Sequence, residues 1–121
     1  RSIMPSKFDI HFFKTANGRE PVQEFLKHLI HSKNSTDKAL ADEILTYLML
    51  LSEKGTTLGM PYSKHLRDSL WELRLKNNRI IYCCIQGNNI YLLHHFKKQS
   101  QKTPLEELKL AIRRYKEFIS R

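Results

Sequence analysis

The sequence predicts an α+β fold in which helices pack on one face of a mainly antiparallel sheet. Three observations support this class: an early pair of segments whose apolar residues recur at helical spacing, a run of three strand-like segments joined by short turns, and a final amphipathic helix. Because strands and helices come in runs, we expect segregated layers and one open sheet face. A chain of 121 residues suits one core, so we expect residues 1–121 to form a single domain, with residues 1–6 disordered or of non-native origin.

The first half of the chain is expected to form one strand and a helical hairpin. Phe8–Phe13 (FDIHFF) is short and aromatic, which is typical of a strand. Pro21 suits the first turn of a helix, and the apolar residues that follow it keep helical spacing. A polar connection leads to a second helix, which is expected to begin near Thr36 or Asp37 and to end at Gly55.

The second half is expected to begin with a loop over residues 55–69 and to continue as three strands. Leu70–Lys76 alternates apolar and polar residues, as a strand with one buried face does. Arg79–Gln86 is apolar on both sides, which favours a central strand. Ile90–Lys98 is the third strand and becomes basic at its end. Turns rich in Asn and Gly join these strands, so they are expected to pair as an antiparallel meander.

The last helix has a strong start signal. Thr103 is expected to be its N-cap, Pro104 its first helical residue, and Glu106 the partner that completes a capping box. Its buried stripe is expected to consist of Leu108, Ile112, Tyr115 and Ile119.

The composition favours some classes of protein and argues against others. Lys and Arg total 21 against 12 Asp and Glu, and the net charge of +9 favours a polyanionic partner or an acidic protein. The sequence has no apolar run of membrane-spanning length, so we expect no membrane contact and a cytoplasmic location. Cys83 and Cys84 are adjacent and would point to opposite faces of a strand, which argues against a zinc site and favours a reducing compartment.

Several polar residues of the predicted meander have the chemistry that RNA cleavage requires. Attack of a ribose 2′-hydroxyl on the adjacent phosphate needs a base, an acid and cations that stabilise the phosphate charge. Glu72 and Arg74 share one face of a predicted strand, and Arg79 opens the next strand. His95 and Lys98 lie at the end of the third strand. Each residue alone is more often part of a solvated surface, so the hypothesis rests on the set.

Lysines around this set are candidates for holding the RNA backbone by point charges. Because the cations are side chains and the set has one carboxylate, we expect no cofactor and no metal ion. The candidate RNA-binding residues are Lys64, Lys76, Lys97 and Lys102.

Five short strings together point to a known family. They are ANGREPV (Ala16–Val22), PYSKHL (Pro61–Leu66), LWELR (Leu70–Arg74), RIIY (Arg79–Tyr82) and LHHFKKQSQKTP (Leu93–Pro104). They occur in this order over nearly the whole chain, and in this the sequence resembles the RelE/ParE toxin superfamily, in particular its HigB-like branch. The ordered set, with its HHFKKQSQKTP ending, is more specific than any single string.

The resemblance implies a RelE-like microbial RNase fold and the toxin of a type II toxin–antitoxin system. Such a toxin is a ribosome-dependent endoribonuclease that cleaves mRNA and so inhibits translation and growth. The implied partners are the ribosome, mRNA and a cognate antitoxin, expected to be a HigA-like helix-turn-helix protein. By position, Arg74 and Arg79 match family arginines near the phosphate, and Lys97 and Lys98 match the basic end of the last strand. Glu72 stands where RelE itself carries a lysine, and a family tyrosine has no counterpart here.

We therefore predict that Arg74 and Arg79 stabilise the scissile phosphate, that Glu72 is the base, and that Lys98 or His95 is the acid. Two other classes of function stay open. One is a ParE-like protein that poisons gyrase without catalysis, and the other is a non-enzymatic nucleic-acid-binding protein. A new 5′-hydroxyl end on RNA would separate the nuclease from both.

Overall fold

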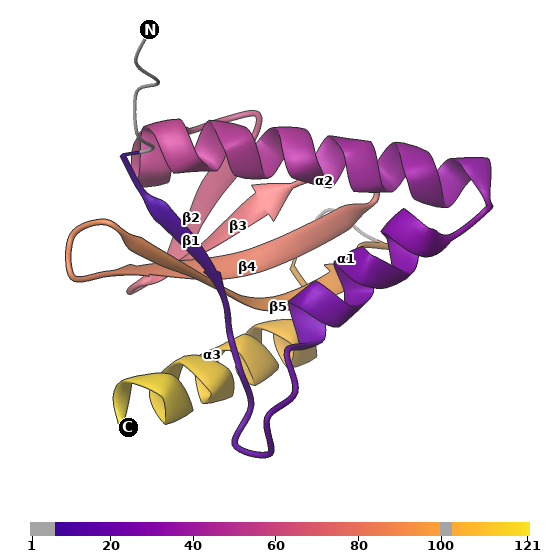
Figure 1. Ribbon diagram of the computed structural model, residues 1–121. Helices are drawn as coiled ribbons and strands as arrows, with labels where there is room; N and C mark the ends of the chain where they lie inside the picture. The colour runs from indigo at the N-terminus through magenta and orange to yellow at the C-terminus, as the bar shows by residue number, and fades with distance from the viewer. Residues whose placement is uncertain (1–6, 100–102) are drawn as a thin grey trace, which may run out of the picture.

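The computed structural model describes residues 7–99 and 103–121 and confirms the α+β class. Figure 1 shows the helices and strands in chain order. They are β1 (Asp9–Phe12), α1 (Pro21–His31), α2 (Ser35–Lys54), the 3-10 helix η1 (Gly55–Thr57), β2 (Ser63–Arg67), β3 (Leu70–Arg74), β4 (Asn78–Ile85), β5 (Asn89–Lys97) and α3 (Leu105–Ile119).

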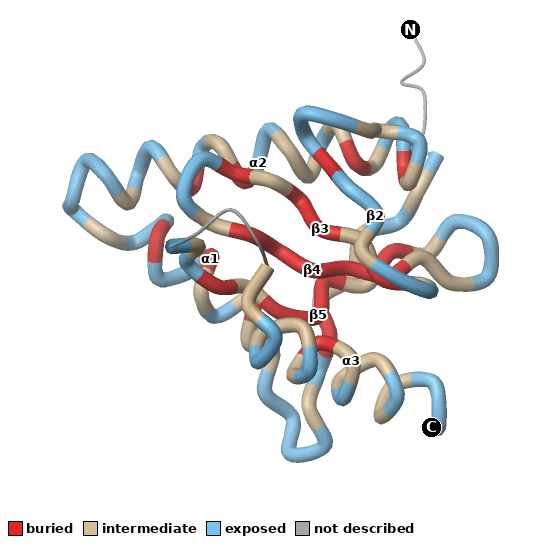
Figure 2. Tube along the Cα trace, turned by 180° about the vertical axis from the view of Figure 1, so that it is seen from behind, coloured by how far each residue is buried: buried red, intermediate tan, exposed pale blue. Residues whose placement is uncertain are grey.

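The five strands form one sheet in the order β1-β5-β4-β3-β2. The pairs β2–β3, β3–β4 and β4–β5 are antiparallel, whereas β1 lies parallel to β5. The strand predicted to be central, β4, does lie between β3 and β5. Its middle residues are buried, as the run of red along β4 and β5 in Figure 2 shows, because both sheet faces are covered there.

The prediction that one sheet face stays open is wrong in part, because helices lie on both faces (Figure 1). On the hairpin face, the side of α1 and α2, the core includes Leu73, Ile80 and Tyr82. On the α3 face, Ile81 and Cys83 pack in a second cluster with residues of α3. A strand that is apolar on both sides requires cover on both sides, and α3 provides it mainly over β5.

The strand β2 was not expected, since residues 55–69 were predicted to be a loop. Its sequence, SKHLR, is mostly polar, and Lys64, His65 and Arg67 are exposed. The strand is at the edge of the sheet, pairs with β3, and carries an irregularity between His65 and Arg67. Edge strands are often short, charged and bulged, so they lack the apolar alternation that identifies a strand in sequence.

The start of α3 also differs from the prediction. The helix begins at Leu105 with Pro104 as N-cap, and no side chain caps its first turn. The predicted capping box of Thr103 and Glu106 is therefore wrong. The Thr103 hydroxyl instead donates a hydrogen bond to the Glu72 carboxylate, 3.0 Å away. At the other end, Ile119 is 52% exposed and does not belong to the buried stripe.

Candidate functional site

Three of the predicted site residues come together on the α3 face of the sheet, where β3 ends and β4 begins. Glu72 and Arg74 are two residues apart on β3, so their side chains share one face. Arg79 on β4 lies directly opposite Arg74 in the antiparallel pair. Ile81 follows Arg79 at a spacing of two and belongs to the cluster packed with α3, which identifies the face.

Glu72 is the centre of this group and is only 1% exposed. The Arg74 Nη1 donates to Glu72 Oε2 at 3.0 Å, and the Thr103 hydroxyl donates to Glu72 Oε1 at 3.0 Å. The Arg79 Nε lies 3.9 Å from Glu72 Oε2, within ion-pair range but beyond a hydrogen bond. Both carboxylate oxygens are thus engaged, and a buried carboxylate held this way fixes the groups around it.

Arg79 is buried, and its guanidinium is fastened to the turn that precedes it. Its Nη1 donates to the backbone carbonyls of Leu75 and Asn78, the latter at 2.9 Å. Its Nε has no hydrogen-bond partner among the described residues. Burial lowers the pKa of Arg79 from its ordinary value, with the neighbouring charge of Glu72 opposing that shift. A buried N–H without a hydrogen-bond partner is costly, and in native proteins it accompanies strain, a catalytic role or a bound water or ion.

Two lysines belong to the same electrostatic neighbourhood. Lys98 follows β5, and its backbone N–H donates to the Asn77 carbonyl at 2.9 Å. Burial lowers the pKa of Lys98; the charges of Arg79, Arg74 and Lys64 lower it further, while Glu72 raises it. Lys64 is the cross-strand partner of Glu72 on β2. Four cations therefore surround one carboxylate, and we call Lys64, Arg74, Arg79 and Lys98 the cationic group. This concentration of positive charge makes this end of the α3 face suited to a polyanion.

The structure does not bring His95 to this group. His95 pairs with Ile80 on the hairpin face, and its ring stacks on Phe25 of α1 with 3.7 Å between centroids and 13° between planes. Burial and the nearby His94 and Arg114 lower its pKa to about 4, so the ring is neutral at physiological pH.

The predicted RNA-binding lysines fall in three places. Lys64 lies beside Glu72, as described above, while Lys76 and Lys97 line a pocket on the hairpin face. Lys102 lies outside the described residues.

His94, the residue before His95, points to the α3 face and links α3 to the sheet. Its Nε2 lies 2.6 Å from Glu107 Oε1, and the Arg114 Nη1 lies 3.3 Å from its Nδ1. The neutral tautomer with the proton on Nε2 satisfies both contacts, because it donates to Glu107 and accepts from Arg114. Burial lowers the pKa of His94, in agreement with a neutral, structural role.

Sequence reasoning missed Thr103 as a partner of Glu72 and missed the pocket on the hairpin face. No sequence signal identifies the first, since the two residues are 31 positions apart. Sequence alternation at the end of β5 indicates that Lys97 and Lys98 point to opposite faces. It thereby assigns Lys97 to the pocket and Lys98 to the cationic group.

Two further findings concern the part of the chain that the structure describes. It contains no group of three or more His, Cys, Asp or Glu residues that could hold a metal ion. None of its helices is both long and apolar enough to cross a membrane.

The comparisons with known proteins identify a family whose match includes the candidate site. A family model described as phage derived protein Gp49-like (DUF891) matches residues 34–116, which run from the N-cap of α2 into α3 and include every residue of the cationic group. No curated protein matches the chain.

Proposed function

Because the chain belongs to the Gp49-like family, which stands with the HigB/RelE-like toxins, we propose that it is a toxin that cleaves mRNA on the ribosome. Toxins of this family typically pair with an antitoxin. The proposed partner is a HigA-like helix-turn-helix protein whose acidic surface would complement the excess of basic residues. The proposed action on ribosomes requires a cytoplasmic location.

The observation that carries the proposal is the cationic group of Lys64, Arg74, Arg79 and Lys98 around the buried Glu72. In-line attack of a 2′-hydroxyl gathers negative charge on the phosphate oxygens in the transition state. Guanidinium groups match that geometry with paired N–H donors, and they act most strongly when they are held in place before the reaction. The backbone carbonyls of the β3–β4 turn hold Arg79 here, and the Glu72 carboxylate holds Arg74 until RNA binds.

In this arrangement Glu72 has two successive roles. Without RNA it orients Arg74 and Arg79. When a phosphate attracts Arg74 outward, Glu72 Oε2 loses its donor and gains the capacity to accept the 2′-hydroxyl proton. The half-buried Arg74, with 20% of its side chain exposed, is the arginine able to make this movement.

Lys98 is the proposed acid for the leaving 5′-oxygen. Burial and neighbouring cations lower its pKa, which makes its ammonium a better proton donor than that of an ordinary lysine. His95 is a poor candidate for this role, because it is stacked on Phe25 on the other face of the sheet. The proposed chemistry uses side chains alone and yields a cyclic or 3′-phosphate and a 5′-hydroxyl.

The experiment that tests the proposal compares two targets. Purified protein is added to programmed ribosomes carrying a defined mRNA and, separately, to gyrase with relaxed plasmid. We expect mRNA cleavage that Arg79→Ala abolishes and supercoiling that is unaffected. Inhibition of supercoiling with intact mRNA would instead identify a gyrase poison, and RNA binding without either effect would identify a non-enzymatic binder.

A further inference from the structure

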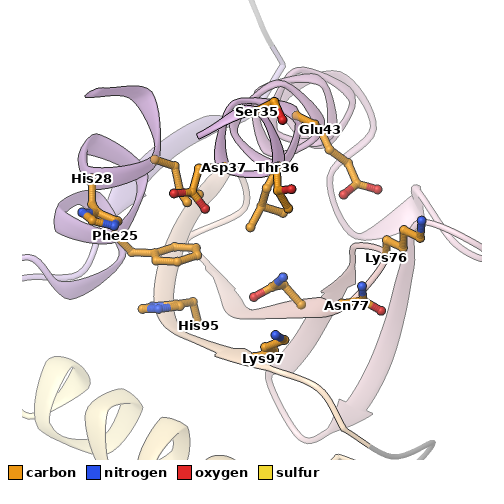
Figure 3. Close-up of a pocket in the computed structure, with 14 residues that line it drawn as sticks. Phe25, His28, Ser35, Thr36, Asp37, Glu43, Lys76, Asn77, His95 and Lys97 are labelled. Carbon is orange, nitrogen blue, oxygen red and sulfur yellow. The ribbon is translucent and has the colours of Figure 1, made fainter. Parts of the chain in front are cut away.

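The hairpin face holds a pocket of about 850 Å³ that the proposed cleavage chemistry does not use (Figure 3). It is bounded by α1, by the first turns of α2, by the β3–β4 turn and by the end of β5. The residues on which the argument depends are Phe25, Lys76, Asn77, Asn78, His95 and Lys97.

One wall of the pocket is aromatic and uncharged. Phe25 and His95 stack with their rings nearly parallel, and in Figure 3 the pair borders the cavity. Because burial lowers the pKa of His95 to about 4, this wall carries no charge at neutral pH. Leu29 and Leu40 extend the apolar lining. Because the two rings cover each other's facing sides, the pair offers ring edges and an outer face, and an aromatic ring can pack against either.

The strand side of the pocket also carries polar groups, which can recognise the edge of a nucleobase and the phosphate of its nucleotide. Asn77 and Asn78 offer amides, each of which both donates and accepts hydrogen bonds. Lys76 and Lys97 are exposed cations at the same rim, and Figure 3 shows them on the strand side of the cavity. Glu43, on α2, contributes a carboxylate that can accept from an exocyclic amine. An aromatic wall, amides and two cations together match a nucleotide.

The pocket and the cationic group lie back to back across the same strand ends. Lys97 lines the pocket, while Lys98, the next residue, belongs to the cationic group. Asn78 and Arg79 are divided in the same way on β4. A polynucleotide that crosses these strand ends can therefore contact both sites with neighbouring nucleotides.

We propose that this pocket binds one nucleotide of single-stranded RNA adjacent to the scissile phosphate, with its base against the Phe25–His95 pair and its phosphate at Lys76 and Lys97. The proposal rests on the proposed function for its substrate class. It gives the protein a base-recognition site on the hairpin face, separate from the residues that act on the phosphate.

The test measures binding without cleavage. The purified chain is titrated with each of the four ribonucleoside 5′-monophosphates, and with inorganic phosphate as a separate arm, while backbone amide signals are followed by NMR. The test variant is the double substitution Lys76→Ala with Lys97→Ala. Its matched control is Lys109→Ala with Lys116→Ala, which removes the same charge from exposed positions on α3.

We expect at least one nucleotide to shift the signals of residues 25, 76–78 and 97, and inorganic phosphate to shift a smaller set. The test variant should lose affinity by about tenfold or more, as expected when charge-assisted contacts to phosphate are removed, and the control should stay within about twofold. Shifts confined to Arg74, Arg79 and Lys98 would overturn the proposal, as would equal losses in the two double variants.

Failure of the pocket and failure of the cleavage function are distinguishable. Nucleotide binding at the pocket in a protein that cuts no mRNA would refute the cleavage function and leave the pocket in place. Cleavage of mRNA without nucleotide shifts at the pocket would refute the pocket alone. If no nucleotide binds and the antitoxin shifts residues 76–78, the pocket is a protein interface and the proposal is wrong.

Discussion

The two faces of the sheet at the ends of β3, β4 and β5 carry their charges in different ways. On the α3 face, Glu72 is 1% exposed and is bound by Arg74 and Thr103, with Arg79 close by. On the hairpin face, Lys76 and Lys97 are exposed beside an aromatic wall. The charges of the first face are interdependent and those of the second are not. Substitutions on the α3 face should therefore alter stability and activity together, whereas those on the hairpin face should alter activity alone.

The largest effect is expected for Arg79→Ala. Removing a preorganised donor to the transition state should lower the cleavage rate by roughly 10²–10³ and abolish growth arrest. Because Arg79 is buried beside Glu72, we also expect a loss of about 1–3 kcal/mol in the free energy of unfolding. Single-turnover cleavage and urea denaturation measure the two effects. Arg113→Ala, an exposed site on α3, is the control and should change neither. An active Arg79→Ala protein would refute the assigned site.

The next largest effect is expected for Glu72→Gln, which keeps the shape of the side chain but removes its charge. Arg74 loses its charged hydrogen-bond partner and Arg79 loses a nearby counter-charge, so cleavage should fall by about 10² if Glu72 also takes the proton. The pH–rate profile separates the two roles. Loss of the acidic limb in the variant supports a base, whereas an unchanged profile at lower rate indicates that Glu72 only positions the arginines.

If Lys98 is the acid, the cleavage rate should depend on pH and should fall on the alkaline side. Its lowered pKa means that the ammonium loses its proton at a lower pH than an ordinary lysine does. Since the protonated form is the proposed acid, cleavage should decrease as pH rises through that lowered pKa. Lys98→Arg keeps the positive charge but releases its proton only at far higher pH. The decrease on the alkaline side should therefore disappear in the variant, and its persistence would exclude Lys98 as the acid.

A smaller effect is expected for Thr103→Val, which tests the link between α3 and the cationic group. The change removes one hydrogen bond to Glu72 and should cost about 0.5–1.5 kcal/mol of stability. Cleavage should fall by no more than about tenfold, because Arg74 and Arg79 still hold the carboxylate. Thermal denaturation of both proteins measures the difference. A stability equal to that of the unchanged chain would mean that this contact is not made in solution.

The smallest stability effect is expected on the hairpin face, for Lys97→Ala. Exposed charges outside networks usually change stability by less than about 0.5 kcal/mol, so the denaturation midpoint should stay unchanged. RNA affinity should nevertheless decrease, and its dependence on salt should become weaker because one phosphate contact is lost. A destabilised Lys97→Ala protein would contradict the distinction drawn between the two faces.

Much of the fold was predictable because it depends on local patterns. The alternation of Leu70–Lys76 and the apolar run of β4 identify paired strands, and the structure confirms both. The edge strand β2 lacked that alternation. The sequence analysis did not predict that α3 packs on the second face of the sheet. It used the apolar residues on both sides of β4 only to place this strand in the centre of the sheet, although such a strand also requires a packed layer on each face.

The candidate site was predictable in part for the same reason. Register along a hairpin brings Arg74 opposite Arg79, so these residues could be grouped from sequence. The burial of Glu72 beside them could not be foreseen, because its carboxylate contacts Thr103, 31 positions away in the sequence. His95 was grouped with Lys98 by proximity in sequence, but the two residues are three positions apart, so alternation places them on opposite faces, and His95 stacks on Phe25.

The central claim is that the cationic group promotes attack by a ribose 2′-hydroxyl. It is tested most directly with ribosome-bound mRNA in which the nucleotide at the cut carries a 2′-deoxyribose. We predict that the all-ribose mRNA yields a 5′-hydroxyl end and that the single deoxy substitution abolishes cutting at that position. A 5′-phosphate end, or unchanged cutting of the deoxy-substituted mRNA, would contradict the account.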